Sequence, residues 1–171
     1  MTRLRAAILA LDGVVARVEA VAIALLVALL TGVTFSQVVS RYVFDDPLIW
    51  SEEAARYLFV WVTMVGAALG MREGGHYGFD IVVKRLPRPV RGALGTVAAL
   101  VVLAFLAVLF VTGVQETQLA AMQYSATLPM RMHWAYLALP VGAGLAIFHV
   151  IVHVARRGPF MHLLDLKEAQ G

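Results

Sequence analysis

Of the 171 residues in this chain, 61% are hydrophobic and 15% are charged, whereas a water-soluble domain usually carries about 45–50% apolar and about 25% charged residues, so an ordinary soluble domain is excluded. The chain contains no cysteine, which excludes disulfides, thiolate nucleophiles and cysteine-ligated metal clusters. Its formal net charge of +3 comes from basic residues placed between apolar runs, a pattern typical of membrane topology rather than of nucleic-acid binding.

The N-terminal segment predicts a helix that lies on the membrane surface. Apolar residues recur at spacings of three and four over residues 4–18, and this stripe is typical of an amphipathic helix, after which we expect the chain to turn into the bilayer. A disordered charged leader is the alternative interpretation. A signal peptide is disfavoured, because Asp12, Arg17 and Glu19 interrupt the apolar stretch that such a signal requires.

Four long runs of low charge follow this segment. They cover residues 20–40, 54–71, 92–115 and 132–155. At about 1.5 Å per residue, helices of these lengths match a hydrocarbon core of about 30 Å, and Arg56 is the only Asp, Glu, Lys or Arg within them. The predicted fold class is an all-α integral membrane protein, a single membrane domain over residues 1–171 with four transmembrane helices and short interfacial helices at about 4–18 and 79–86.

Basic residues in the connecting segments predict the direction of the spans. The segments before the first span, between the second and third, and after the fourth hold three, five and three Lys or Arg residues. The other two links hold only Arg41 and Arg131. Because Lys and Arg stay preferentially on the cytoplasmic side, we predict that both termini are cytoplasmic.

The entry to the second span carries the densest group of candidate functional residues: Trp50, Ser51, Glu52, Glu53 and Arg56. Ser51 is expected to cap the helix, and the two glutamates stand in its first turn, where the helix dipole favours carboxylates. An earlier helix start after Asp46-Pro47 is the alternative. The simplest interpretation is a well-formed helix start; the second is that Arg56, which is costly in lipid, faces a protein partner or a polar cavity.

Small residues gather further along the second span, where Gly66 and Gly70 are four residues apart. This spacing lets another helix backbone approach closely, and the neighbour is either in the same chain or in another subunit. The link that follows contains Arg72, Glu73, His76 and Asp80. Its glycines do not form a phosphate-binding loop, because the Walker spacing and a strand-to-helix setting are missing.

The fourth span contains Trp134 and Pro140, and Pro140 is expected to kink the helix. It also contains His149 and His153, four residues apart on one helical face. A metal or haem site is possible by this spacing, but the other three spans contain no histidine that could complete one. We therefore expect these histidines to serve in packing, and we expect no cofactor and no metal.

No acidic residue lies centrally in any of the four runs. A transporter that works alone usually needs ionisable groups or broken helices near the middle of the bilayer. We therefore expect that this chain is not an enzyme and does not carry a substrate by itself.

Four sequence motifs together resemble a known family. They are Trp-Ser-Glu-Glu-Ala-Ala-Arg-Tyr at 50–57, Gly-Ala-Ala-Leu-Gly-Met-Arg-Glu-Gly-Gly-His at 66–76, Asp80 before Lys-Arg-Leu-Pro at 84–87, and Trp-Ala-Tyr-Leu-Ala-Leu-Pro at 134–140. In this combination the chain resembles the DctQ-like small membrane subunit of tripartite ATP-independent periplasmic (TRAP) transporters. The loop before the fourth span departs from the family's pattern, because its prolines are displaced and Arg131 is introduced.

The resemblance implies a non-catalytic small permease subunit in the bacterial inner membrane. It implies two protein partners, a large permease subunit and a periplasmic substrate-binding protein, beside membrane lipid, and ion-gradient-driven uptake of an organic acid. Trp50, Ser51, Glu52, Glu53, Arg56, Gly66 and Gly70 are then candidates for the partner interface or assembly. Arg72, Glu73, His76 and Asp80 are candidates for a structural role in the cytoplasmic loop, and Trp134 and Pro140 for packing of the fourth helix. The alternatives are a four-helix anchor of a haem oxidoreductase and a small stand-alone exporter.

Overall fold

The computed structural model describes residues 2–72 and 88–157 of the chain, and this part is built from helices. The elements are α1 (Thr2–Val43), α2 (Ile49–Arg72), α4 (Arg88–Ala120), α5 (His133–Tyr136) and α6 (Ala138–Arg157). Four helical stretches are long and apolar enough to cross a membrane, namely Ala10–Val43, Ile49–Arg72, Ala93–Ala120 and His133–His153. The predicted fold class, an all-α protein with four spans, is confirmed. The predicted interfacial helix at 79–86 lies outside the described residues.

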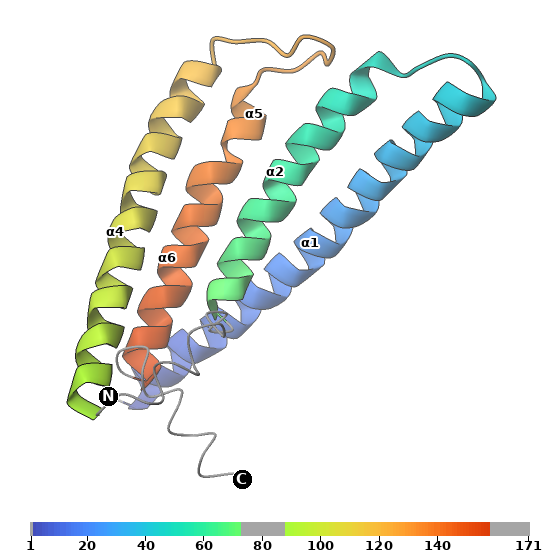
Figure 1. Cartoon of the computed structure of the whole chain (residues 1–171). Helices are drawn as coiled ribbons and strands as arrows, with labels where there is room; N and C mark the ends of the chain where they lie inside the picture. The colour runs from blue at the N-terminus through green and yellow to red at the C-terminus, as the bar shows by residue number, and fades with distance from the viewer. Residues whose placement is uncertain (1, 73–87, 158–171) are drawn as a thin grey trace.

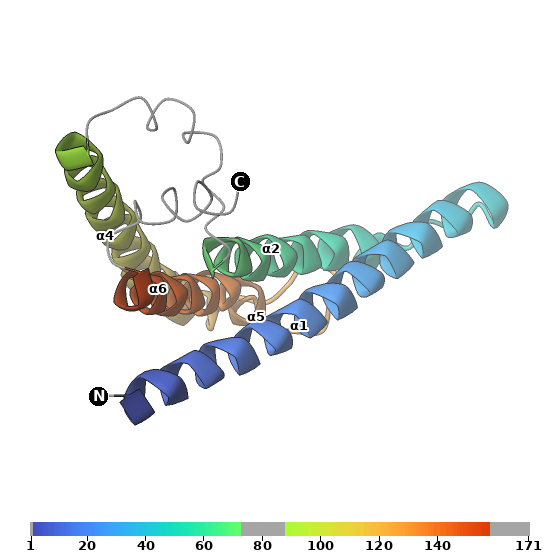
Figure 2. The ribbon, with the colours of Figure 1, turned by 90° about the horizontal axis from the view of Figure 1, so that it is seen from below.

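The fourth span is the centre of the bundle. Figure 1 shows α6 between α4 and α2, with α1 beside α2, and Figure 2 shows α1 crossing the other helices obliquely. Half of the fourth span is buried inside the protein, compared with 11% of the first and second spans and 17% of the third. A core of Ala68 from α2, Leu106 from α4, and Ala146 and Val150 from α6 joins these three helices.

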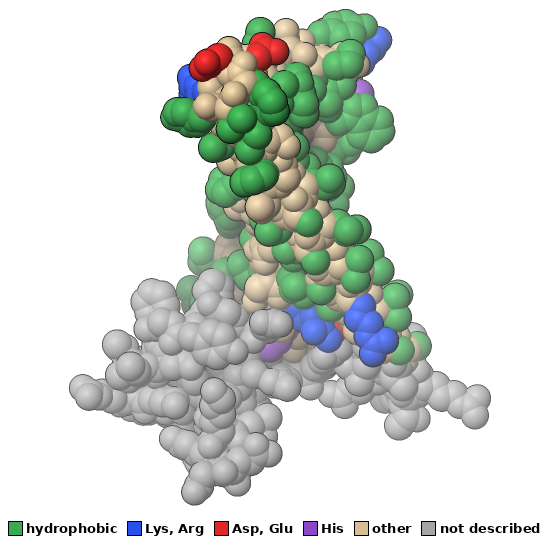
Figure 3. Space-filling view, turned by 90° about the vertical axis from the view of Figure 1, so that its right-hand side faces the viewer, with side chains coloured by type: hydrophobic (Ala, Val, Ile, Leu, Met, Phe, Trp, Pro, Cys, Tyr) green, Lys and Arg blue, Asp and Glu red, His purple; other side chains and the backbone are tan. Residues whose placement is uncertain are grey.

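The outer surface fits a membrane environment. On the face that α1 forms, Figure 3 shows hydrophobic side chains between basic side chains at one end and acidic and basic side chains at the other. Large apolar side chains are exposed along α1 and α4, among them Leu25, Leu29, Phe105 and Val108. Since lipid tails solvate such side chains, this exposure is what a membrane-spanning bundle requires.

Helix α1 is continuous, and the turn expected before the first span is wrong. The helix runs without interruption for 42 residues, about 63 Å at 1.5 Å per residue, which exceeds the hydrocarbon thickness. The physical reason is that Asp12 and Glu19 are buried against α6, so this part of α1 packs on the bundle. The location of residues 4–18 at the membrane surface stays a prediction.

The closest helix approaches involve glycines other than those that the sequence pattern singled out. A Cβ added to Gly142 of α6 would lie 2.7 Å from the Cβ of Met64 and 2.9 Å from its carbonyl oxygen on α2. One added to Gly113 of α4 would lie 3.0 Å from the Cδ of Pro140. At Gly66 and Gly70 a Cβ would meet nothing within 4 Å among the described residues. These two glycines therefore face open space, whereas Gly142 and Gly113 bring helices together.

The fourth span is interrupted where a proline was expected to disturb it. Helix α5 ends at Tyr136 and α6 begins at Ala138, with Leu137 between them. Pro140 has no backbone N–H, so it cannot donate the helical hydrogen bond to the carbonyl of Tyr136. The helix is thus interrupted at Leu137, and the kink at Pro140 stays a prediction.

Two glycine-to-alanine variants test this packing. Gly142→Ala is expected to destabilise the protein by about 1–3 kcal/mol, because the new methyl group overlaps the backbone of α2. Gly66→Ala is expected to stabilise it by about 0.5–1 kcal/mol, because alanine favours a helix interior and finds free space there. Thermal unfolding in detergent, followed by circular dichroism, measures both. Equal effects from the two substitutions would contradict the assignment of the close approach to Gly142.

Candidate functional site

The turn between α1 and α2 is fixed by backbone contacts. The N–H of Asp46 donates to the carbonyl of Ser40 at 3.2 Å, and the Ser40 hydroxyl donates to the carbonyl of Asp46. Asp45 has a φ of 54°, in the left-handed region that aspartate tolerates better than most residues do. The chain therefore reverses within a few residues and returns as α2.

The start of α2 differs from the predicted one at Ser51. The helix begins at Ile49, two residues earlier, so Ser51 is inside it and the expected capping role is wrong. The Ser51 side chain is buried, and its hydroxyl donates to the carbonyl of Leu48 at 2.6 Å. The earlier start after Asp46-Pro47 is the interpretation that fits.

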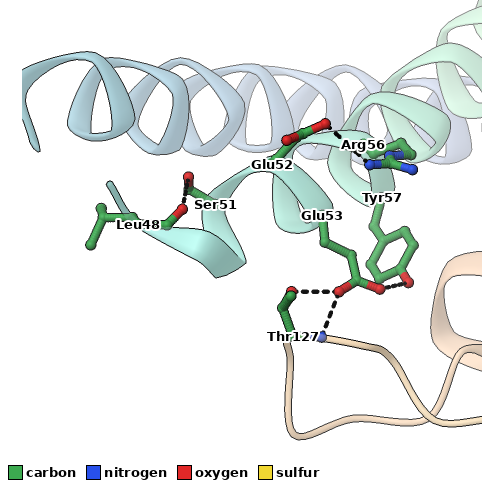
Figure 4. A network of polar contacts seen from close by, with 7 residues as sticks. All are labelled: Leu48, Ser51, Glu52, Glu53, Arg56, Tyr57 and Thr127. Carbon is green, nitrogen blue, oxygen red and sulfur yellow. Dashed lines mark hydrogen bonds and ion pairs between the residues drawn. The ribbon is translucent and has the colours of Figure 1, made fainter. Parts of the chain in front are cut away.

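Glu53 ties α2 to the loop between α4 and α5. One carboxylate oxygen accepts from the backbone N–H of Thr127 at 2.9 Å and from the Thr127 hydroxyl. The other accepts from the Tyr57 hydroxyl and, at 3.4 Å, from the N–H of Ala126. Figure 4 shows the contacts of Glu53 with Tyr57 and Thr127. Hydrogen bonds to an ionised carboxylate are stronger than neutral ones. We call this group, made of Glu53, Tyr57, Ala126 and Thr127, the Glu53 clamp.

The loop that the clamp holds is itself folded. The N–H of Ser125 donates to Met130 at 2.9 Å, and the Arg131 guanidinium donates to the carbonyl of Ala121 at 3.0 Å. The same guanidinium lies 5.3 Å from the ring centroid of Tyr124, within range of a cation–π interaction. Arg131, where the sequence departs from the family pattern, therefore closes the loop onto the end of α4.

The neighbouring charged pair points away from the clamp. Glu52 and Arg56 lie one helical turn apart with 3.5 Å between Oε1 and Nη2, and their side chains are 76% and 67% exposed. Figure 4 shows them on the side of α2 opposite Glu53 and Tyr57. An exposed ion pair of this kind contributes little to the free energy of folding. The stability of the chain therefore does not explain why the pair is present.

Exposed residues continue from this pair along one face of α2. They recur every three or four positions, which places them in one line along the helix. We call this line the α2 outer face, made of Glu52, Arg56, Phe59, Thr63, Ala67 and Gly70. Gly66 adjoins it and also faces open space. Four of the residues predicted as assembly candidates, Glu52, Arg56, Gly66 and Gly70, are thus brought together.

The remaining predicted residues lie elsewhere. Trp50 is exposed at the start of α2. The Trp134 ring is also exposed, and its backbone carbonyl accepts from the Trp61 indole at 3.0 Å. Pro140 lies against Gly113 on α4. Arg72 points into the protein, as described next, and Glu73, His76 and Asp80 lie outside the described residues.

Sequence reasoning missed a buried polar cluster at the other end of the bundle. His149 of α6 is 1% exposed, and its Nδ1 and Nε2 lie 2.8 and 2.9 Å from carboxylate oxygens of Asp12 and Glu19 on α1. Arg72 of α2 donates from Nε to Asp12 at 3.0 Å. We call these four residues the His149 cluster. The seven-residue interval between Asp12 and Glu19 places both on one face of α1. This spacing was the feature of the sequence that could have predicted the cluster.

The cluster adds to the interpretation of His149. The ring is buried between helices, as expected for a packing histidine, and in addition both ring nitrogens contact carboxylates of α1. The same contacts occupy the two positions through which an imidazole would bind haem iron. Among the described residues, no group of three His, Cys, Asp or Glu side chains is arranged to hold a metal ion.

Comparisons with known proteins agree with the family resemblance. The family described as "Tripartite ATP-independent periplasmic transporters, DctQ component" matches residues 30–158. The chain is 32% identical over 130 residues to the sialic acid TRAP transporter small permease protein SiaQ of Vibrio cholerae, covering 76% of this chain and 75% of that protein. It is 35% identical over 121 residues to the C4-dicarboxylate small permease protein DctQ of Rhodobacter capsulatus, covering 67% and 53%.

A third relative is much longer than this chain. The match to the sialic acid TRAP transporter permease protein SiaT of Haemophilus influenzae is 33% identical over 120 residues. It covers 70% of this chain but only 20% of that protein. The chain therefore spans a fifth of SiaT, about half of DctQ and three quarters of SiaQ.

The Glu53 clamp is tested by a pair of adjacent substitutions. Glu53→Gln is expected to speed amide hydrogen exchange at Thr127 about tenfold, because it replaces a charged acceptor by an amide that cannot accept at both ends. Glu52→Gln, on the exposed side of the same helical turn, is the matched control and is expected to leave exchange unchanged. Hydrogen–deuterium exchange with mass spectrometry in detergent gives the readout. Equal exchange in the two variants would show that the clamp does not order the loop.

Proposed function

Because the chain belongs to the family of DctQ components of TRAP transporters, we propose that it is the non-catalytic small permease subunit of such a transporter and holds a large permease subunit through its α2 outer face. The observation that carries the assignment of this face is the exposed Glu52–Arg56 pair at the end of an apolar helix. Charged side chains of transmembrane segments usually face protein or water rather than lipid.

Small residues along the same face support a helical partner. Ala67 and Gly70 are exposed, and Gly66 has free space where its side chain would be. In lipid, helices associate mainly through close packing at such positions, because the hydrophobic effect does not drive them together. A helix of the large permease that packs here would approach the α2 backbone closely, and its polar groups would meet Glu52 and Arg56.

The length of one relative supports a large partner in the membrane. In SiaT of Haemophilus influenzae the matching segment is a fifth of a longer permease chain, so a unit of this kind operates beside further permease structure. This chain would make the same contact between separate subunits. The Glu53 clamp supports the face indirectly by fixing the start of α2.

The end that carries the Glu53 clamp is the proposed periplasmic side. The chain reverses there at Asp45, and the folded loop with Arg131 lies beside it, so a periplasmic binding protein would meet these two connections. The proposed location is the bacterial inner membrane with both termini cytoplasmic. The substrate class is organic acids, supported by relatives named for sialic acid and C4-dicarboxylates, and uptake would be driven by an ion gradient.

Added bulk on the α2 outer face is expected to weaken assembly. Ala67→Leu should weaken the complex with the large permease by about 1–3 kcal/mol, which is about fivefold to 150-fold in affinity, because the larger side chain prevents close helix contact. The measurement is recovery of the large permease with the affinity-tagged chain after co-expression in mild detergent. Ala107→Leu on the exposed side of α4 adds the same bulk and is the matched control. Arg56→Glu should weaken recovery as well.

Two results would count against this assignment. If Ala67→Leu and Arg56→Glu both retain the large permease while Ala107→Leu releases it, the interface lies on α4 instead. If the unmodified chain never retains a large permease, the proposed function itself fails. Both readings require that the variants keep a normal thermal unfolding profile.

The orientation is tested by reporter fusions. A reporter that is active only in the cytoplasm is expected to be active when fused after Gly171 and silent when inserted after Ala126. The physical reason is the excess of Lys and Arg in the links on the side of the termini. The reverse pattern would overturn the proposed orientation.

A further inference from the structure

We propose that the His149 cluster is a proton-binding site. It holds one proton more than a neutral histidine with two ionised carboxylates would carry, and this proton stabilises the contact between the N-terminal half of α1 and α6. The cluster lies at the opposite end of the bundle from the Glu53 clamp and does not depend on the assembly proposed above. Its argument rests on hydrogen-bond geometry, on the balance of charge and on the position of α1.

The geometry of His149 requires an additional proton. Nδ1 lies 2.8 Å from Oδ1 of Asp12, and Nε2 lies 2.9 Å from Oε2 of Glu19. A neutral imidazole has one N–H, and an ionised carboxylate has none. With a neutral ring and two carboxylates, one of these contacts would set a nitrogen lone pair against an oxygen lone pair. A second proton, on the ring or shared with a carboxylate oxygen, turns both contacts into hydrogen bonds.

The charge of Glu19 points the same way. With the additional proton, the positive charge of His149 lies beside the Glu19 carboxylate. Without it, that carboxylate has no charged partner among the described residues. Asp12, Glu19 and His149 are 1%, 3% and 1% exposed, and an unpaired charge in such surroundings is costly. Oε1 of Glu19 is buried without a hydrogen-bond partner among the described residues, so His149 is the principal support of that carboxylate.

The described residues around His149 include few other ionisable groups. From α1, Asp12 and Glu19 face His149, whereas Arg17 between them is exposed. From α2 the facing group is Arg72. On α6 itself, His153 is buried one helical turn further on. On α4, residues 93–115 contain no Asp, Glu, His, Lys or Arg. Among the described residues, the proton is therefore assigned to the His149 cluster, and His153 is the nearest titratable neighbour along α6.

The position of α1 makes this proton structurally important. Helix α1 packs along α2 and has much less contact with α6, and Asp12 and Glu19 are the α1 residues whose carboxylates contact His149. Figure 2 shows α1 crossing below the end of α6. Because the docked state holds the proton, removal of the proton favours release of this half of α1.

Distance measurements between spin labels test the proposal directly. The sequence has no cysteine, so Val14→Cys and Ile151→Cys, both at exposed positions on α1 and α6, place two labels in the full chain in lipid nanodiscs. The distance distribution should be narrow near about pH 6 and should lose its narrow peak near about pH 10, two conditions that lie on either side of the reference pKa of a histidine in a model peptide. A second pair, Phe59→Cys and Val141→Cys on α2 and α6, should not change.

Two variants in the labelled chain separate this proton from other titrations. In Glu19→Gln the amide can donate to Nε2, so a neutral His149 satisfies both contacts and the narrow peak should persist at high pH. Arg17→Gln removes an exposed charge from the same stretch of α1 and should behave like the unmodified chain. The proposal is overturned if the unmodified chain keeps its narrow peak at high pH, or if Glu19→Gln loses the peak equally.

A second measurement does not depend on any variant of Glu19 folding correctly. Nitrogen-15 NMR of the imidazole rings distinguishes a ring with two N–H groups, or with a proton shared to a carboxylate, from a neutral ring; His149→Gln identifies the signal. The expected result is such a protonated or proton-sharing ring at the pH where the narrow distance is present. A fully neutral ring with the helices still docked would overturn the proposal.

Discussion

The close contact of α6 with the helices on either side is the constraint on which this structure depends. In a bilayer the surrounding lipid is as apolar as the side chains, so helices associate through packing and polar contacts rather than through the hydrophobic effect. Gly142 brings α6 against the backbone of α2, and Gly113 lets Pro140 of α6 lie against α4. These contacts explain why the fourth span is half buried while the others remain largely exposed.

Polar contacts then fix the bundle at its two ends. At one end, Glu53 joins α2 to the loop that follows α4. At the other end, His149 of α6 joins Asp12 and Glu19 of α1, and Asp12 also joins Arg72 of α2. Asp12, Glu19 and His149 are buried, and in such low-dielectric surroundings a satisfied polar contact is strong and an unsatisfied one is costly. The result is a bundle held at both ends, which we call the platform. Of its two adjacent glutamates, Glu52 faces outward and Glu53 binds the loop.

A platform of this kind fits a small permease subunit better than a substrate pathway. Among the described residues, Asp12, Glu19, Arg72 and His149 contact one another and the Glu52–Arg56 pair is exposed near the start of α2. The charged and small residues of the α2 outer face make no close contact with the rest of the described chain that explains them. Surfaces that the fold does not explain are the places where a membrane partner is expected. The proton proposed for the His149 cluster would set how firmly α1 is held to this platform.

The sequence by itself determined the class of protein, the number of spans and the family, because apolar run length and motif order are local properties of the chain. It also predicted a disturbance of the fourth span, which is interrupted at Leu137. Only the tertiary structure decided which glycines bring helices together, that Ser51 does not cap α2, and that α1 continues without a turn. The contacts of His149 join residues 130 and 137 positions apart, and no local pattern reports such pairs. Their existence depends on how the helices cross, and that is set by packing in three dimensions.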